Sequence, residues 1–101
     1  MDILVKKREI FEISLDSNPS TGYKWKVENV PEMLHLVEEK YELNLNQTGG
    51  SGKVIFVFKG LNKGNCELIF IYKRPWEEQE IKKIVKRVAI VENNGNDIRI
   101  F

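Results

Sequence analysis

Apolar residues recur at every second position in several separate stretches of this chain, and this spacing constrains the fold more than any other feature. In the clearest stretch, Phe11, Ile13 and Leu15 alternate with Glu12 and Ser14. A period of two places successive side chains on opposite faces of a strand, whereas an amphipathic helix repeats its apolar positions every three or four residues. Similar strand-like patterns occupy residues 23–27, 41–45, 66–72 and 84–91, with a candidate last strand at 98–101. The chain is therefore predicted to be all-β.

One further segment, Val54–Phe58, is a continuous apolar run that is short enough to be a strand buried on both faces. Residues that break strands fall between these segments: Asn18-Pro19, Pro31, Gly49, Gly60, Gly64, Pro75 and Gly95. About six to eight short strands separated by turn residues favour a sandwich or barrel. Only residues 31–39 are ambiguous, because they could begin with a helical turn around Glu32-Met33-Leu34.

Length and charge narrow the function classes. With 101 residues, the chain fits one domain, residues 1–101, which can bury a core without disulfides or metal. It carries 16 Lys and Arg against 15 Asp and Glu, so its net charge of +1 gives no electrostatic reason to expect nucleic acid or an anionic membrane as partner. We expect a protein that is monomeric when free.

The first residues, Met1 to Lys7, lack the apolar core of a signal peptide. This favours an intracellular protein, or a secreted or lysosomal one if a signal has been removed. Asn46-Gln47-Thr48 matches an N-glycosylation acceptor, which matters only in a protein secreted by a eukaryote.

Catalytic and metal-binding patterns are weak. His35 is the only histidine and has no metal-ligand spacing around it, and Cys66, the only cysteine, alternates with Leu68 and Phe70 and is expected to be a buried apolar residue. Glu77, Glu78 and Glu80 form an acidic cluster that is more typical of a solvated loop than of paired catalytic carboxylates. The glycine cluster Gly49-Gly50-Ser51-Gly52 does not precede a predicted helix, so it is not a phosphate loop. We expect no enzyme activity, no metal and no cofactor.

Three loops between the predicted strands have unusual chemistry. In the first, Asn18-Pro19-Ser20-Thr21-Gly22, proline fixes its own φ and glycine permits a positive φ, so the loop should be stiff and present Ser20 and Thr21 outward. A plain turn is the alternative. The second loop contains the glycine cluster Gly49, Gly50, Ser51 and Gly52.

The third loop, Arg74-Pro75-Trp76, follows a strand-like run. Trp76 could close the core, or it could be an exposed anchor at a loop tip, since Trp and Arg are enriched at binding hot spots. Two glutamates directly after Trp76 favour the exposed alternative.

Three motifs, in this order along the chain, resemble the chagasin family of cysteine-protease inhibitors. They are the Asn18–Gly22 segment with Tyr23-Lys24-Trp25, the glycine cluster, and Tyr72-Lys73-Arg74-Pro75-Trp76. The first motif is similar to the family's Asn-Pro-Thr-Thr-Gly-aromatic-x-Trp, with Ser20 replacing the first Thr. The third matches the family's Arg-Pro-Trp loop. The middle motif reads Gly-Gly-Ser-Gly where the family has Gly-x-Gly-Gly.

The resemblance implies an immunoglobulin-like β-sandwich and reversible inhibition of papain-like cysteine proteases. It also implies that the three loops bind the protease: Asn18 to Gly22 over the catalytic pair, Gly49 to Gly52 on the unprimed side, and Arg74, Pro75 and Trp76 on the primed side. The alternatives are a non-inhibitory immunoglobulin-like interaction or adhesion module and a small carbohydrate-binding module that uses Trp76 and Tyr23. The inhibitor hypothesis requires loops 17–22, 46–53 and 74–80 at one end of the sandwich, with Trp25, Phe56 and Phe70 buried.

Overall fold

The computed structural model describes residues 2–43 and 52–93 of the protein. Within these ranges the chain forms seven strands and one short 3-10 turn, η1. In chain order the elements are β1 (Ile3–Lys6), β2 (Ile10–Ser17), η1 (Pro19–Thr21), β3 (Lys24–Val27), β4 (Leu34–Leu43), β5 (Gly52–Gly60), β6 (Gly64–Lys73) and β7 (Lys82–Val91). The prediction of an all-β chain with about seven or eight strands is confirmed. No helix within these ranges is long and apolar enough to cross a membrane.

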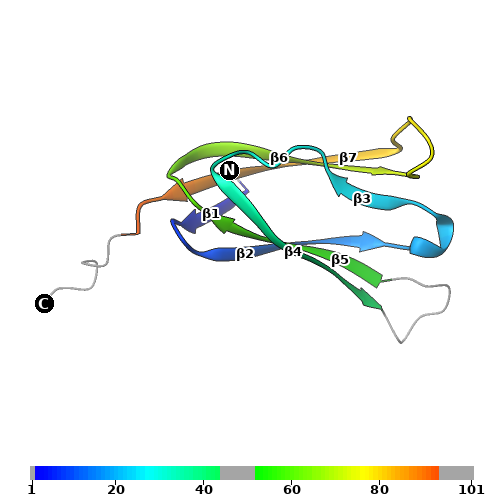
Figure 1. Ribbon diagram of the computed structural model, residues 1–101, viewed down its shortest axis with the longest axis horizontal. Helices are drawn as coiled ribbons and strands as arrows, with labels where there is room; N and C mark the ends of the chain where they lie inside the picture. The colour runs from blue at the N-terminus through cyan, green and yellow to red at the C-terminus, as the bar shows by residue number, and fades with distance from the viewer. Residues whose placement is uncertain (1, 44–51, 94–101) are drawn as a thin grey trace, which may run out of the picture.

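The strands form two sheets that pack face to face (Figure 1). One sheet has the order β1-β7-β6-β3 and the other has the order β2-β5-β4. β1 runs parallel to β7, whereas the other neighbouring strands are antiparallel. The resulting sandwich leaves its connections at the two ends, where loops can vary without disturbing the sheets.

Aromatic rings from both sheets meet in the core. Phe70 of β6 lies 5.1 Å from Phe56 and 6.4 Å from Phe58, both of β5, measured between ring centroids. All three side chains are fully buried, and Trp25 of β3 is buried beside them in the same cluster. The predicted burial of Trp25, Phe56 and Phe70 is therefore confirmed.

The outer face of β5 is buried as well, as its continuous apolar sequence predicted. Ile55 and Val57 point away from the core, yet both are buried. Neighbouring strands cover them: Lys40 of β4 is paired in register with Ile55, and Glu12 of β2 with Val57. Lys40 Nζ lies 3.6 Å from Glu12 Oε2, so the two side chains cross over β5 and their aliphatic carbons exclude water from it.

The ambiguous segment 31–39 is mostly strand. A single turn, in which Leu34 N donates to Pro31 O at 3.0 Å, leads directly into β4. Leu36 pairs with Phe58, but a β-bulge at Val37 moves the next position on the same face of the strand to Glu39, which is exposed and pairs with Phe56. The inserted residue shifts the phase of the alternation, which explains why the sequence pattern did not reveal the first half of this strand.

Cys66 was expected to be buried, and the structure corrects this: it lies on β6 but is only partly buried at the edge of the core. Burial nevertheless raises the pKa of its thiol, because desolvation penalises the thiolate. A smaller thiolate fraction at neutral pH makes Cys66 a poor nucleophile.

The turn between β1 and β2 contains Arg8, which has a φ of 77° although it is not glycine. Its backbone N donates to Gly60 O at 2.9 Å, which holds the turn against the end of β5. An L-residue other than Asn or Asp pays about 1 kcal/mol for this left-handed conformation. We therefore expect Arg8→Asn to increase the free energy of unfolding by roughly 0.5–1 kcal/mol, as measured by urea denaturation.

The control for this prediction is Arg8→Ala, which removes the same charge but keeps the strained conformation. It should leave the free energy of unfolding within about 0.5 kcal/mol of the wild-type value. Equal gains for the Ala and Asn variants would show that charge, not backbone strain, limits stability at this turn.

Candidate functional site

Two of the three loops that were singled out in the sequence lie side by side at one end of the sandwich (Figure 1). The first connects β2 to β3, and the third connects β6 to β7. The strands that lead to the second loop end there as well, because Ser17 of β2 is paired with Gly52 of β5, which is paired with Leu43 of β4. The expected convergence is confirmed for the first and third loops, whereas Gly49, Gly50 and Ser51 lie outside the described residues.

Gly52 occupies a different place from the one expected. It is the first residue of β5, is buried, and pairs with strands on both sides, so it belongs to the sheet and not to the loop. A Cβ added here would collide with the carbonyl oxygen of Glu42 and stand 2.7 Å from the Tyr41 hydroxyl. The glycine is required by the close approach of β4.

The first loop is held by its own hydrogen bonds. Asn18 Oδ1 accepts a hydrogen bond from Ser20 N at 3.2 Å, and Asn18 O accepts bonds from Thr21 N at 3.1 Å and Thr21 Oγ1 at 2.7 Å. These bonds close the 3-10 turn that starts at Pro19, and Gly22 then reverses the chain with a φ of 86°. Ser20 and Thr21 are exposed at the tip. The predicted outward-facing tip is confirmed, and the hydrogen bonds support the predicted stiffness of the loop.

The base of this loop is anchored to the core. Trp25 Nε1 donates to Asp16 O at 2.8 Å, which ties β3 to the end of β2. The Tyr72 ring packs on Trp25 at 4.7 Å and on Tyr23 at 5.4 Å between centroids. These contacts join the first loop to β6, the strand that leads into the third loop.

The third loop turns sharply at Arg74-Pro75-Trp76. Glu77 N donates to Arg74 O at 3.0 Å to close the turn, and Lys73 Nζ donates to Glu77 O at 2.9 Å. Trp76 stands at the tip with 72% of its surface exposed. A largely exposed indole contributes little to folding, so the exposed alternative of the sequence analysis is the correct one.

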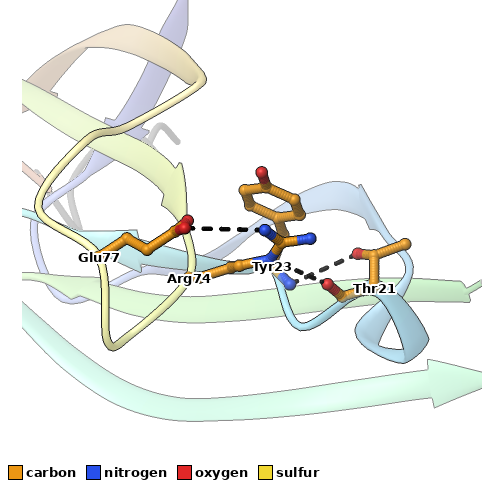
Figure 2. A network of polar contacts seen from close by, with 4 residues as sticks. All are labelled: Thr21, Tyr23, Arg74 and Glu77. Carbon is orange, nitrogen blue, oxygen red and sulfur yellow. Dashed lines mark hydrogen bonds and ion pairs between the residues drawn. The ribbon is translucent and has the colours of Figure 1, made fainter.

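A network of polar contacts links the two loops (Figure 2). Arg74 Nε donates to Thr21 O at 3.2 Å, and the Arg74 Nη1 atom lies 3.7 Å from Glu77 Oε2. The guanidinium also lies over the Tyr23 ring, with Cζ 4.4 Å from the ring centroid. Hydrogen bonds from a charged donor and cation–π contacts each stabilise by about 0.5–2 kcal/mol, with the lower values at exposed sites such as this one.

Gly22 and Trp76 form a second contact between the loops. A Cβ built on Gly22 would stand 2.9 Å from Trp76 Cη2, so the edge of the indole lies directly over the glycine. Glycine is needed here twice, once for its positive φ and once for the close approach of the ring.

We expect Gly22→Ala to lower the free energy of unfolding by about 1 kcal/mol, because alanine is strained at this φ. The clash with Trp76 adds little, since an exposed indole can move away. Urea denaturation measures the change. Gly22→Asn is the matched control: asparagine tolerates a positive φ but carries the same Cβ, so it should be the more stable variant. An alanine variant as stable as wild type would contradict the strain argument.

The other candidate residues do not form a reactive site. Among residues 2–43 and 52–93, no group of three or more His, Cys, Asp or Glu side chains could hold a metal ion. His35 lies exposed on β4 and Cys66 lies on β6 in the other sheet. Glu78 and Glu80 are exposed, while Glu77 is paired with Arg74.

A sequence model of the Chagasin family peptidase inhibitor I42 matches residues 4–90, which is most of the chain. The chain belongs to the chagasin family. The family resemblance drawn from the loop motifs is therefore confirmed, and so is its functional content of protease inhibition. Because the members of this family are described as peptidase inhibitors, the match is consistent with the expectation that this chain is not an enzyme.

Known proteins similar to this chagasin-family chain include Amoebiasin-1 of Entamoeba histolytica, which is 32% identical over 75 residues that cover 73% of this chain and 74% of the relative. The crystal structure of the cysteine protease inhibitor EhICP2 from Entamoeba histolytica aligns with a TM-score of 0.75 at 24% identity, covering 88% and 87% of the two chains. The structure of PbICP-C in complex with falcipain-2 aligns with a TM-score of 0.58 at 18% identity, covering 89% and 84%. These likenesses confirm the immunoglobulin-like β-sandwich.

Proposed function

We propose that this chain is a reversible, competitive inhibitor of papain-like cysteine proteases and that its loops block the active-site cleft. Two relatives support this target class: EhICP2 is described as a cysteine protease inhibitor, and PbICP-C forms a complex with falcipain-2. The observation that carries the proposal is the exposed Trp76, held beside the stiff Asn18–Gly22 loop by contacts within the chain. Residues 1–101 act as a single inhibitor domain without cofactor, metal or catalytic activity.

Each loop has a role in this proposal. The loop Asn18, Pro19, Ser20, Thr21 and Gly22 covers the catalytic cysteine and histidine of the protease. In the second loop, Gly49, Gly50 and Ser51, which precede the sheet residue Gly52, run along the unprimed side of the cleft, where glycines permit a close approach between two backbones. Arg74, Pro75 and Trp76 occupy the primed side, where the indole stacks on the protease surface.

The inhibitor is not cleaved in this arrangement, because peptide hydrolysis needs a carbonyl carbon in line with the attacking sulfur. The tip of the first loop is a closed turn, in which Asn18 O is already occupied by bonds from Thr21 N and Oγ1. A loop that is ordered before binding loses little entropy on binding. We expect a dissociation constant around nanomolar from an interface of roughly 800 Å² per partner.

The test is a titration of papain, and of several other papain-like enzymes, with the folded chain at a series of substrate concentrations. The apparent inhibition constant should rise linearly with substrate concentration, dilution of the complex should restore activity, and the recovered inhibitor should be intact. Absence of inhibition across these enzymes would favour the non-inhibitory interaction module. Inhibition that does not depend on substrate concentration would argue against occupation of the cleft.

A further inference from the structure

Arg74 lies in the loop that is proposed to bind the protease, yet the contacts of its guanidinium are made within the chain. Its Nε atom donates to the carbonyl oxygen of Thr21, a residue 53 positions away. Its charged face covers the Tyr23 ring, and Nη1 is paired with Glu77. The Arg74 side chain is about one-third exposed, whereas most of the Trp76 side chain, two residues later, is exposed.

We propose that Arg74 is a positioning residue that holds the first and third loops as one preorganised unit, and that it acts on the protease through this unit. The proposal rests on the proposed inhibitory function. It assigns to Arg74 the relative placement of Thr21 and Trp76, which sit on different loops and must enter the same cleft together.

The geometry of the contacts requires arginine. A planar guanidinium can donate from its Nε edge to one backbone carbonyl, form an ion pair with a carboxylate through Nη1, and lie flat on an aromatic ring at the same time. A lysine ammonium is a single point charge and cannot satisfy these three partners in one position. The hydrogen bond to Thr21 O is the important one, because it joins the third loop to the backbone of the first.

A second contact depends on this placement. The edge of the Trp76 indole lies over Gly22, the residue that follows the carbonyl bound by Arg74. If the loops separate, the indole loses this support and samples many rotamers. The fraction of molecules that are ready to bind then falls, and the apparent dissociation constant rises in inverse proportion to that fraction.

This mechanism has a kinetic signature. A residue that orders the free inhibitor changes the population of the binding-competent state, so its loss lowers the association rate constant. A residue that contacts the protease stabilises the complex, so its loss raises the dissociation rate constant. The two roles of Arg74 can therefore be separated with one variant.

The experiment measures both rate constants for papain by stopped flow, with the wild type, Arg74→Ala and Arg74→Lys. The matched control is Arg87→Ala, because Arg87 also has its Nε paired with a carboxylate, Glu67 Oε2 at 3.4 Å, but lies on the strand β7 away from the loops. We expect Arg74→Ala to lower the association rate constant about tenfold with the dissociation rate constant changed by less than about twofold. The association rate constant of Arg74→Lys should lie between those of Arg74→Ala and the wild type. Both rate constants of Arg87→Ala should match those of the wild type.

A second measurement reports on the free protein and needs no protease. In ¹H–¹⁵N NMR spectra, Arg74→Ala should shift the amide signal of Gly22, the residue beside the edge of the indole, and raise the mobility of the Trp76 indole N–H. Arg87→Ala should do neither. A higher dissociation rate constant with an unchanged Gly22 amide would overturn the proposal and make Arg74 a direct contact. If the wild type inhibits no papain-like enzyme, the proposed function fails, while the Gly22 and Trp76 signals still decide whether Arg74 couples the loops.

Discussion

We expect the Trp76→Ala variant to inhibit papain about 30-fold less tightly than the wild type, a loss of about 2 kcal/mol in binding free energy. The indole is the largest exposed side chain at the tip of the third loop, with 72% of its surface available to a partner. Burying an aromatic side chain of this kind in an interface removes a large apolar area from water, which is why tryptophan dominates many alanine scans. The measurement is the inhibition constant of each variant in the same assay.

The thermal melt of Trp76→Ala should match that of the wild type, because the side chain contributes little to the core. Trp25→Ala is the matched control: its side chain is only 7% exposed and donates to Asp16 O, so the same substitution should cost about 3–5 kcal/mol of folding stability. A large fall in melting temperature for Trp76→Ala would place that residue in a structural role. Unchanged inhibition would remove it from the interface.

The parts of the fold that follow from local rules were predictable from the sequence. Apolar residues take every second position from Phe11 to Leu15 in β2 and from Cys66 to Tyr72 in β6, and the continuous apolar run of β5 matches its place between two strands. β4 was only half recognised, because the bulge at Val37 breaks its phase. β1 was missed, since it has four residues and is defined by parallel pairing with β7 at the other end of the chain.

In the candidate site, too, features set by the local sequence were predictable, whereas features set by distant partners were not. The stiffness of the first loop follows from Pro19 and Gly22, whose backbone preferences are local. Exposure of Trp76 was favoured by the charged residues that follow it. The inward contacts of Arg74 could not be predicted, because its hydrogen-bond acceptor is a backbone carbonyl in a distant loop, and every residue type presents such a carbonyl. The sheet position of Gly52 depends equally on its partners in β2 and β4.

Substitution of Thr21 by arginine should cause the largest loss of inhibition, about 100-fold or 2.7 kcal/mol. Thr21 is exposed at the tip of the first loop, which is the part proposed to lie over the catalytic pair. A long cation at this position must either displace the loop from the cleft or lose its hydration without a partner, and both are costly. The free protein can direct the same side chain into solvent, so the melting temperature should change little.

Two smaller substitutions separate this effect from the loss of the hydroxyl. Thr21→Ser keeps an Oγ atom that can donate to Asn18 O and should inhibit like the wild type, whereas Thr21→Ala loses that bond and should weaken inhibition less than about tenfold. The backbone carbonyl that Arg74 binds is present in all three variants, so the link between the loops is unchanged. Papain should be titrated with each variant, with thermal melts in parallel. The inhibition constant should increase in the order Thr21→Ser, Thr21→Ala, Thr21→Arg. An arginine variant that inhibits as well as the alanine variant would show that the tip of the first loop lies outside the protease cleft.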